Sequence, residues 1–450
     1  MQKVLVVGNG AREHAIAEAL ARSPQKPELY CYVTARNPGI LRIARGYQIG
    51  DIRKGSEVAS YASRMGIDIA VIGPEGPLEA GVVDDLESAG IVCASPSRKA
   101  AEIETSKLFA RWLMDKYRIP GRKEWRAFED PREAEKFIDE MARPVVVKPI
   151  GLTGGKGVKI VDPRVSGQLK DLEEAKAYAR KVIEERIGGA AKVLVEDLLI
   201  GEEFTLQAFV DGKHLVPTPI VQDNKFAYEG DTGPFTGSMG SFSDSNHLLP
   251  FMTAMDFYAA LQVMERTVEA LRKEGLRYKG ALYGGFILTA ETPKVLEFNA
   301  RWGDPEVINV LPLFEGDFLD ACWAMAEGKL RKLVPSFKNK ATVCKYVAPQ
   351  GYPIDPVKGG KVEIGDLGSS KALIHFASVD ERDGEIFMSS SRALTCTGIA
   401  DTMVEAERIA EDAISRIRGP VFHRPDIGTK RLLEKRVSHM NRIRRGRANG

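Results

Sequence analysis

Glu297, Asn299 and Arg301 alternate in the stretch "VLEFNARWGDPE" (295–306). Side chains two residues apart in an extended strand leave the same face, so we expect these three side by side. A carboxylate and an amide oxygen about 7 Å apart along a strand suit a hard cation such as Mg²⁺, which also keeps phosphate oxygens as ligands. With a guanidinium beside them, the pattern indicates phosphoryl transfer. A polar, solvated strand face is the alternative.

The stretch "KPIGLTGGKGV" (148–158) combines glycines with Lys148 and Lys156. A Walker P-loop needs a glycine five residues before the Gly-Lys pair and Ser or Thr after it. Ile150 and Gly157 take those two positions here, so the stretch is not a P-loop. Apolar runs flank the glycines, which predicts a hairpin that closes over a ligand and presents ammonium groups to phosphate oxygens. A glycine-rich turn without a ligand is the alternative.

Two further polar segments offer groups to a substrate. "DNKFAYEGDTGPFTGSMGSFSD" (223–244) is long for a connection between strands, and loops of that length are commonly functional or disordered. Its candidate binding residues are Asp223, Lys225, Asp231 and Thr232. "EDLLIGEE" (196–203) ends a strand and carries nearby acids, which indicate either recognition of ribose hydroxyls or a solvated turn.

The elements that must position these groups begin with short apolar runs, such as 3–8 and 68–73, that alternate with helical patterns. This alternation predicts a doubly wound parallel sheet, with ligands beyond the carboxyl ends of the strands. "GNGAREH" (8–14) and "GPEGPLEAG" (73–81) both lie at such ends. The first begins like a dinucleotide fingerprint, but Glu13 replaces the third glycine, which disfavours an NAD-dependent oxidoreductase.

From about Thr105 the pattern changes to helices near 131–142 and 172–187, separated by β-rich runs. Further strands are predicted at 192–197, 203–210, 281–288 and 294–302, followed by short strands and a final helix near 402–417. The fold class predicted from these patterns is a multidomain protein of mixed α/β and α+β type, with an N-terminal parallel sheet and a β-rich C-terminal part.

The composition excludes several classes of protein. The 64 Lys and Arg nearly balance the 62 Asp and Glu of the 450 residues, so a net charge of +2 gives no reason to expect nucleic acid as a partner. The segment 430–450 carries eight Lys and Arg against the single acid Glu434, and we expect a solvated, mobile terminus there, with contact to a polyanion as the alternative. Five scattered cysteines and the lack of a long apolar run predict a cytoplasmic protein without disulfides, zinc or a membrane span.

Taken in order along the chain, the motifs resemble the phosphoribosylamine–glycine ligase (glycinamide ribonucleotide synthetase) family of ATP-grasp enzymes. The segments that carry the resemblance include "VLVVGNGAREHA", "SKLFAR", "VVVKPIGLTGGKGV", "VEDLLIGEEFT", "GDTGPFTGSMGSFS", "VLEFNARWGDPE" and "RPDIG". They run from about Lys3 to Gly428, nearly the whole chain. Phe235 and Ser238 depart from the family pattern, which has an amide and a glycine at these places.

The resemblance implies ATP held between two sheets, with the glycine hairpin as part of the clamp. It divides the chain into an N-terminal α/β substrate domain (1–104), an ATP-grasp domain (105–334) with a lid of about 120–192, a C-terminal β-rich domain (335–435) and a basic tail (436–450). Glycine, 5-phosphoribosylamine and ATP are the implied small-molecule partners of a monomer or small homo-oligomer.

The resemblance also assigns roles to residues. Those placed at ATP are Lys107, Lys148, Gly154, Gly155, Lys156, Glu196, Leu198 and Glu203. Those placed at the other substrates are Gly10, Arg12, Glu75, Asp223, Asp231, Thr232 and Gly233. Arg301, Lys225 and Asp223 are the catalytic candidates, and Glu297 and Asn299 are the ligands expected for Mg²⁺ or Mn²⁺.

The reaction implied by the resemblance has two steps. Glycine's carboxylate attacks the γ-phosphate of ATP to give glycyl phosphate, and the amine of 5-phosphoribosylamine then displaces phosphate to give glycinamide ribonucleotide. Both steps depend on positioning and charge neutralisation. The alternatives are another ATP-grasp ligase or carboxylase, for example one that uses bicarbonate, a nicotinamide oxidoreductase, and a non-catalytic nucleotide- or RNA-binding module.

Overall fold

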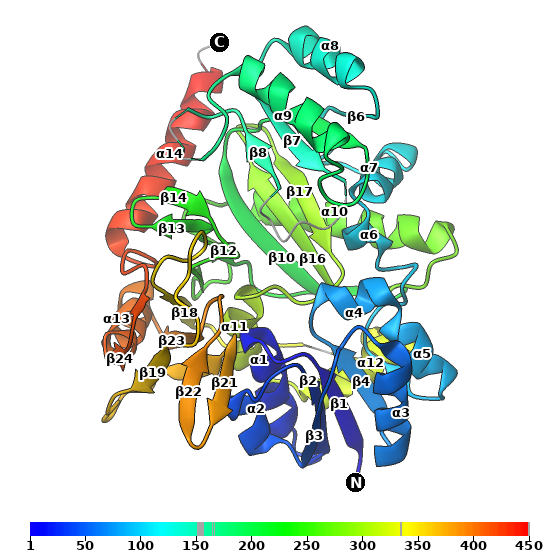
Figure 1. Ribbon diagram of the computed structural model, residues 1–450, viewed down its shortest axis with the longest axis vertical. Helices are drawn as coiled ribbons and strands as arrows, with labels where there is room; N and C mark the ends of the chain where they lie inside the picture. The colour runs from blue at the N-terminus through cyan, green and yellow to red at the C-terminus, as the bar shows by residue number, and fades with distance from the viewer. Residues whose placement is uncertain (151–156, 164, 166, 334, 449–450) are drawn as a thin grey trace.

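The computed structural model describes residues 1–150, 157–163, 165, 167–333 and 335–448 (Figure 1). Its N-terminal part is the predicted parallel sheet, in the order β3-β2-β1-β4-β5. The strands are β1 (Lys3–Val7), β2 (Glu28–Val33), β3 (Gly46–Ile49), β4 (Ile69–Ile72) and β5 (Val92–Cys93). The helices are α1 (Ala11–Ala21), α2 (Pro38–Ile43), α3 (Gly55–Met65), α4 (Glu75–Ala80) and α5 (Val82–Ser88). The strand order reverses between β1 and β4, so ligands are expected after these two strands, where Gly8 and Gly73 lie.

A central antiparallel sheet, β11-β10-β16-β17, occupies the middle of the molecule (Figure 1). Its strands are β10 (Glu202–Asp211), β11 (Leu215–Pro217), β16 (Lys279–Leu288) and β17 (Pro293–Asn299). Successive residues of β10 serve opposite faces: Leu206 joins the core beneath α10 (Ala254–Lys273), whereas Phe209 packs against Phe318 of α12 (Phe318–Glu327). Helices therefore cover both faces of the sheet. Three short helical pieces follow β17 or α12, namely α11 (Glu306–Val310), η1 (Leu311–Leu313) and η2 (Leu330–Lys332).

A second antiparallel sheet, which we call the lid sheet, has the order β6-β9-β7-β8. Its strands are β6 (Trp125–Phe128), β7 (Val145–Pro149), β8 (Lys159–Ile160) and β9 (Val193–Asp197). It has a core of its own beneath α8 (Pro131–Met141) and α9 (Leu172–Glu184), and α6 (Glu102–Thr105) and α7 (Lys107–Lys116) precede it in the chain. Val146 pairs with Ile160, so the glycine stretch joins two antiparallel strands as predicted. Gly154, Gly155 and Lys156 lie outside the described residues.

The C-terminal part contains two sheets. The larger has the order β12-β15-β18-β23-β20, and β25 (Val421–Phe422) also pairs with β18. Its other strands are β12 (Gln222–Asp223), β15 (Gly240–Ser243), β18 (Ala341–Pro349), β20 (Leu373–Phe376) and β23 (Leu394–Ala400), and α13 (Met403–Ile414) packs against β18 and β23. The smaller sheet has the strands β19 (Lys361–Ile364), β21 (Val379–Arg382), β22 (Glu385–Met388) and β24 (Ile417–Arg418). The predicted fold class is confirmed.

The segment 223–244 corrects one expectation. It is not a long irregular loop, because β13 (Phe226–Tyr228) and β14 (Thr232–Phe235) form a hairpin within it and β15 completes it. β13 has only three residues, and β14 and β15 contain glycine and hydroxyl residues, so these strands lack the long hydrophobic alternation that marks a strand in a sequence.

The structure of the C-terminal segment also differs from the expectation. Residues 430–448 form the helix α14 (Lys430–Ala448), drawn in red along one side of the central sheet in Figure 1. Leu432 and Met440 are buried in the main core, and Val437 and Ile443 pack against it. These residues form an apolar stripe at helical spacing, which the many basic residues between them hide in the composition. The expectation of a solvated, mobile terminus is therefore wrong for this segment. Among the helices of the described residues, none combines the length and the apolar character needed to cross a bilayer.

Candidate active site

The side chain of Glu13 fills the turn that follows β1. Glu13 is buried, and its carboxylate accepts hydrogen bonds from the Gly10 backbone N–H and from Nε of Arg12, both at 2.5 Å. A Cβ added at Gly73, after the neighbouring strand, would overlap the Glu13 carboxylate. The carboxylate thus occupies the crevice where a dinucleotide pyrophosphate would approach the N-terminus of α1. This arrangement argues against the nicotinamide alternative, as the sequence predicted from Glu13.

A cleft of about 240 Å³ opens beside this turn, where loops of the N-terminal and C-terminal parts meet. Its lining residues are Gly8, Asn9, Gly10, Glu13, Thr34, Ile52, Pro74, Asp304, Ala377, Ser378, Ser391 and Arg392. Of the predicted substrate residues, Gly10 lines the cleft. Arg12 is buried behind it and donates from Nη1 to the backbone oxygen of Trp302 at 3.3 Å.

Glu297 and Asn299 lie on β17 two residues apart, as predicted, opposite Gly285 and Tyr283 of β16. The surroundings of Glu297 would raise its pKa by desolvation, but the charges of Lys225, Lys148 and Arg301 outweigh this effect and lower the pKa below its usual value. The carboxylate is therefore ionised at neutral pH, which fits a cation ligand.

The described residues contain no group of three or more His, Cys, Asp or Glu that could hold a metal ion. A carboxylate and an amide oxygen are nevertheless a donor set that fits Mg²⁺, which usually keeps several water and phosphate oxygens as ligands.

Lys148 is held by a buried carboxylate. Glu196, on β9, is fully buried and ion-paired with Lys148 at 2.8 Å, Lys123 at 2.6 Å and Arg111 at 2.5 Å. These three cations overcome the effect of burial and keep the pKa of Glu196 well below its usual value. Lys107, at the start of α7, donates to the backbone oxygen of Ile150 at 3.4 Å, directly before the glycine stretch.

This cluster joins the lid sheet to the central sheet, because Arg111 also donates to the Leu296 backbone oxygen on β17 at 2.6 Å. Arg111 and Lys123 were not among the predicted site residues. Arg111 belongs to the quoted segment "SKLFAR", whereas Lys123 has no spacing or motif that could have identified it. Leu198, predicted at the adenine, follows β9 and donates its backbone N–H to Pro144 at 3.1 Å.

Asp223, Lys225 and Glu203 form a second charged group near Glu297. Lys225 Nζ lies 2.7 Å from Glu203 Oε2. Burial raises the pKa of Asp223 to about 7, although the Lys225 ammonium opposes the shift. Burial alone would lower the pKa of Lys225, but Asp223 and Glu203 raise it well above its usual value. Asp223 thus titrates near neutrality, as groups in active sites commonly do.

The strand predicted at 294–302 ends at Asn299, so Arg301 lies beyond β17 and not, as expected, on a strand face with Glu297 and Asn299. Arg301 reaches the N-terminal part. Its guanidinium is 3.2 Å from Glu104 and 3.4 Å from Glu75, and it lowers the pKa of Glu75 to about 2. Burial raises the pKa of Glu104, whose Oε2 accepts the backbone N–H of Ala300 at 2.7 Å. Two predicted site residues, Arg301 and Glu75, are therefore joined across the boundary between the N-terminal and central parts.

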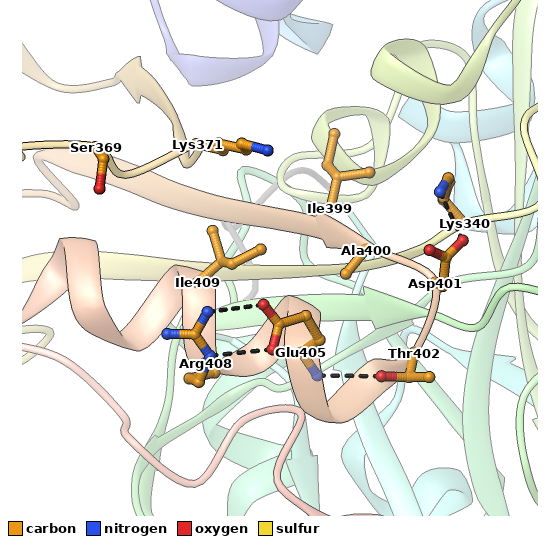
Figure 2. A pocket seen from close by; sticks show the side chains of 10 residues that line it. All are labelled: Lys340, Ser369, Lys371, Ile399, Ala400, Asp401, Thr402, Glu405, Arg408 and Ile409. Carbon is orange, nitrogen blue, oxygen red and sulfur yellow. Dashed lines mark hydrogen bonds and ion pairs between the residues drawn. The ribbon is translucent and has the colours of Figure 1, made fainter.

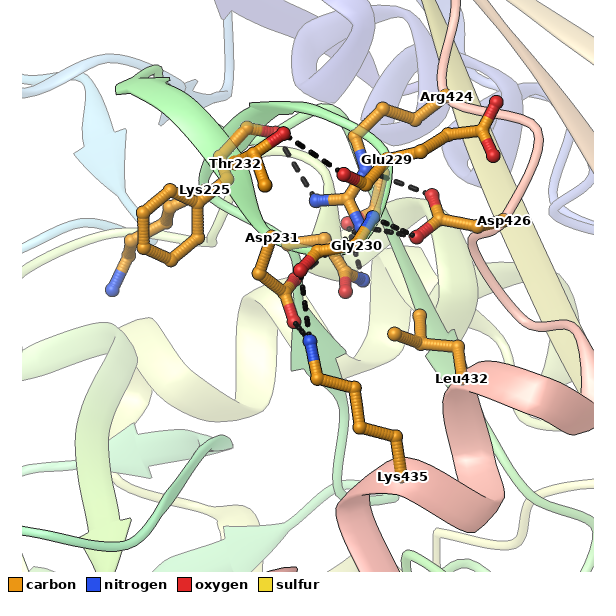
Figure 3. Close-up of polar contacts among 12 residues, drawn as sticks. Lys225, Glu229, Gly230, Asp231, Thr232, Arg424, Asp426, Leu432 and Lys435 are labelled. Carbon is orange, nitrogen blue, oxygen red and sulfur yellow. Dashed lines mark hydrogen bonds and ion pairs between the residues drawn. The ribbon is translucent and has the colours of Figure 1, made fainter. Parts of the chain in front are cut away.

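Of the predicted substrate residues, Asp231 lies at the tip of the β13–β14 hairpin, next to Thr232 (Figure 3). Thr232 and Gly233 are the first two residues of β14. The Asp231 carboxylate faces Lys435, at 2.8 Å, and Arg424, at 3.3 Å. The Thr232 hydroxyl donates to the Glu229 backbone oxygen at 2.9 Å. Gly233 has a φ of +81° and lies against the Tyr228 ring, which a Cβ at this position would overlap, so a side chain is excluded there.

Three residues that the sequence did not indicate form a buried contact beside the cleft. Arg392 donates to Asp304 at 3.1 Å and to the Ser238 backbone oxygen at 3.0 Å, and its guanidinium lies 4.2 Å from the centre of the Tyr346 ring. Asp304 belongs to the motif around Glu297, but Tyr346, on β18, and Arg392, just before β23, are distant in the chain and have no sequence signal. Ser238, at the family's glycine position, has a φ of +90° and donates its hydroxyl to the Gly240 oxygen at 2.9 Å.

A larger hollow, of about 520 Å³, lies wholly within the C-terminal part, between the start of α13 and residues 369–371 (Figure 2). Four of its five charged side chains pair with one another, Lys340 with Asp401 at 2.6 Å and Arg408 with Glu405 at 2.7 Å, and the fifth is Lys371. It contains no predicted site residue.

The central sheet with its acid and amide, and the lid sheet with its hairpin and Lys148, together define an ATP-grasp enzyme. Three family profiles cover the chain: the phosphoribosylglycinamide synthetase N domain over residues 2–104, its ATP-grasp (A) domain over 105–307 and its C domain over 342–430. The chain belongs to the phosphoribosylglycinamide synthetase family, as the motifs predicted.

The chain is 51% identical to a phosphoribosylamine–glycine ligase of Pyrococcus horikoshii over 443 residues, which are 98% of each chain. It is similar to a crystal structure of phosphoribosylamine–glycine ligase from Thermotoga maritima, with a TM-score of 0.80, 29% identity and coverage of 94% of this chain and 99% of that one. A biotin carboxylase domain of Hydrogenobacter thermophilus 2-oxoglutarate carboxylase shares the fold at 16% identity, with a TM-score of 0.71 and coverage of 98% and 94%.

Proposed function

We propose that this protein is a phosphoribosylamine–glycine ligase, which joins glycine to 5-phosphoribosylamine at the expense of ATP in purine synthesis. The observation that carries the proposal is the ionised Glu297 carboxylate among the charges of Lys148, Lys225 and Arg301, where the lid sheet meets the central sheet. Relatives about 50% identical over nearly the whole chain carry this name, which supports the ligase over the carboxylase alternative.

In this proposal ATP lies between the lid sheet and the central sheet. Lys107, Lys148 and the hairpin residues Gly154, Gly155 and Lys156 meet its phosphates, and Glu203 meets the ribose hydroxyls. The Glu196 side chain is saturated by three cations, which favours a role in fixing Lys148. The adenine contact then falls to the backbone at 196–198 and to Leu198.

Glu297 and Asn299 would hold a divalent cation, Mg²⁺ or Mn²⁺, which neutralises charge on the phosphates. The charges of Lys148 and Lys225 already act on the same place, so the chain itself supplies much of the field that stabilises a transferring phosphoryl group. We assign Lys225, Arg301 and Asp223 to the catalytic group. Arg301 also fixes the N-terminal part against the central sheet through Glu75 and Glu104.

The turn at Gly10 and Arg12, with Glu75, Asp223 and the tip at Asp231, Thr232 and Gly233, faces glycine and phosphoribosylamine in this proposal. Asp223 can hold the glycine ammonium once it is ionised. Glycine's carboxylate then attacks the γ-phosphate, and the amine of phosphoribosylamine attacks the resulting acyl phosphate. An acyl phosphate hydrolyses readily, which explains a lid that excludes water.

An ADP-release assay with phosphoribosylamine generated in situ tests the assignment. ADP is expected only when glycine is present with phosphoribosylamine, and the product is glycinamide ribonucleotide. Release of ADP with bicarbonate but not with glycine would establish the carboxylase instead. Consumption of NADH in a hydride-transfer assay would restore the oxidoreductase.

Three further points complete the proposal. The domain limits are 1–104, 105–334 and 335–435, and the basic segment 436–450 follows the third domain. The enzyme acts in the cytoplasm. It acts as a monomer or small homo-oligomer.

A further inference from the structure

Arg436, on α14, contacts three segments that are far apart in the sequence. Its guanidinium donates to Oδ1 of Asp231 at 2.9 Å and to Oδ1 of Asn224 at 3.3 Å. It also lies 2.9 Å from Oδ2 of Asp231 and 3.4 Å from Oε2 of Glu202. Asp231 is the hairpin tip, Asn224 separates Asp223 from Lys225, and Glu202 begins β10 directly before Glu203. The Arg436 side chain is only 14% exposed, so these contacts are partly buried and differ from a fully exposed surface pair.

The neighbouring residues of α14 strengthen the same attachment. His439 Nδ1 lies 2.6 Å from Oε1 of Glu202, and Lys435 lies 2.8 Å from Asp231 (Figure 3). Arg424, before α14, approaches Asp231 from the other side, at 3.3 Å. Burial would raise the pKa of Asp231, but Arg436 and Lys435 lower it to about 2, so the carboxylate stays charged.

The attachment continues from α14 into the proposed nucleotide site. Gln222 donates from Nε2 to Glu202 at 3.3 Å and to the Glu203 backbone oxygen at 2.9 Å. Glu203 in turn holds Lys225 at 2.7 Å. One chain of contacts therefore runs from Arg436 and His439 through Glu202 and Gln222 to Glu203, which is assigned to the ribose of ATP, and to Lys225 of the catalytic group.

We propose that Arg436 is a positioning residue for the nucleotide. Through Arg436, α14 fixes the start of β10 and the segment after β12, and this orients Glu203 toward the ribose and Lys225 toward the transferring phosphoryl group. The inference rests on the proposed function in one respect, namely that Glu203 and Lys225 belong to the nucleotide site. Arginine suits this role because its planar fork can bond several acceptors at once, which a lysine cannot.

Arg444 provides a matched control on the same helix. It pairs with Asp256 at 2.8 Å, at the start of α10, and makes no contact with Glu202, Asn224 or Asp231 in the described residues. Arg436→Met and Arg444→Met each remove one charge from α14 and keep much of the side-chain volume, so both report on the attachment of the helix.

Titration of each variant with ADP and Mg²⁺ by calorimetry tests the inference without any ligase activity. Arg436→Met is expected to raise the dissociation constant for ADP about tenfold, Arg436→Lys by less, and Arg444→Met by under twofold. In steady state, the KM for ATP rises about tenfold in Arg436→Met, while the KM for glycine changes less than twofold.

Equal weakening of ADP binding in both methionine variants, or an unchanged ADP affinity in Arg436→Met, overturns the inference. A rise in the KM for glycine alone does so as well. If Arg436→Met does not fold, His439→Gln takes its place, because His439 reaches Glu202 from a side chain that is 34% exposed. Arg436-dependent ADP binding in a protein without ligase activity would refute the proposed function and leave this inference standing.

Discussion

Lys225 Nζ lies 2.7 Å from the carboxylate of Glu203, so a side chain assigned to phosphate and a side chain assigned to ribose hold each other before any nucleotide arrives. Glu203→Gln keeps the size of the side chain but removes the charge that orients Lys225 and the strong acceptor for ribose hydroxyls. We expect the KM for ATP to rise about tenfold and kcat to fall by less than about threefold. Glu229→Gln, at an exposed position on the β13–β14 hairpin, is the control and should change neither constant. A purely kcat effect in Glu203→Gln would contradict the ribose assignment.

Glu297→Gln should abolish most of the activity. It retains the shape of the side chain but loses the carboxylate that the surrounding cations keep ionised. Removal of one preorganised charge from such a site typically costs about 10²–10³ in kcat. Single-turnover ADP formation measures the loss, and an unchanged melting temperature shows that the fold survives. Glu265→Gln, on the exposed side of α10, should retain wild-type turnover. Wild-type turnover in Glu297→Gln would remove Glu297 from the metal site.

Asp223→Asn should stabilise the protein at alkaline pH while it impairs glycine use. The pKa of Asp223 is about 7 in the folded protein and about 3.9 in an unfolded chain. Between these values the folded state binds more protons, so the contribution of Asp223 to stability falls as the pH rises through about 7. Asparagine cannot ionise, so its advantage over aspartate grows from about pH 4 to about pH 7 and is constant above.

Urea unfolding of the wild type and of Asp223→Asn at pH 5 and at pH 8 measures this pH dependence. The other titrating groups are the same in both proteins, so their effects cancel in the difference between the two free energies of unfolding. The gain in the free energy of unfolding should be larger at pH 8. An equal gain at the two pH values would show that Asp223 does not titrate near neutrality. For the wild type, kcat/KM for glycine should rise with pH up to about 7 and then level off if Asp223 binds the glycine ammonium as proposed, because only the ionised carboxylate attracts that charge.

Glu196→Gln should destabilise the protein by about 3–5 kcal/mol, because it leaves the buried charges of Arg111, Lys123 and Lys148 without their shared partner. Glu124→Gln removes an acid from an exposed pair with Arg143 and should cost no more than about 1 kcal/mol. Chemical denaturation of the two variants gives the comparison. Similar values for both would mean that solvent reaches Glu196 and screens its ion pairs.

The parts of the fold that follow from local patterns were predictable from the sequence. The run 3–8 and the helix after it are found as β1 and α1, and alternation along 294–302 placed Glu297 and Asn299 on one strand. Contacts that depend on distant segments were not predictable. Lys123 and Arg392 meet their partners only through the tertiary fold, and the apolar stripe of α14 is diluted by its arginines and lysines.

The way the sheets connect the parts of this protein also determines how it unfolds. The pairing of β15 with β18 carries one sheet from the central part into the C-terminal part, and a single core contains Leu5, Phe204 and Val343 from the three larger parts. The lid sheet has its own core, and the ion pairs of Glu196 join it to the part of the protein that shares the larger core. Cooperative unfolding should therefore have two stages, with the lid as the smaller foldon. Amide hydrogens of β7 and β9 should exchange with solvent faster than those of β10 and β16, and a bound nucleotide should slow the exchange of the lid because it couples the two units.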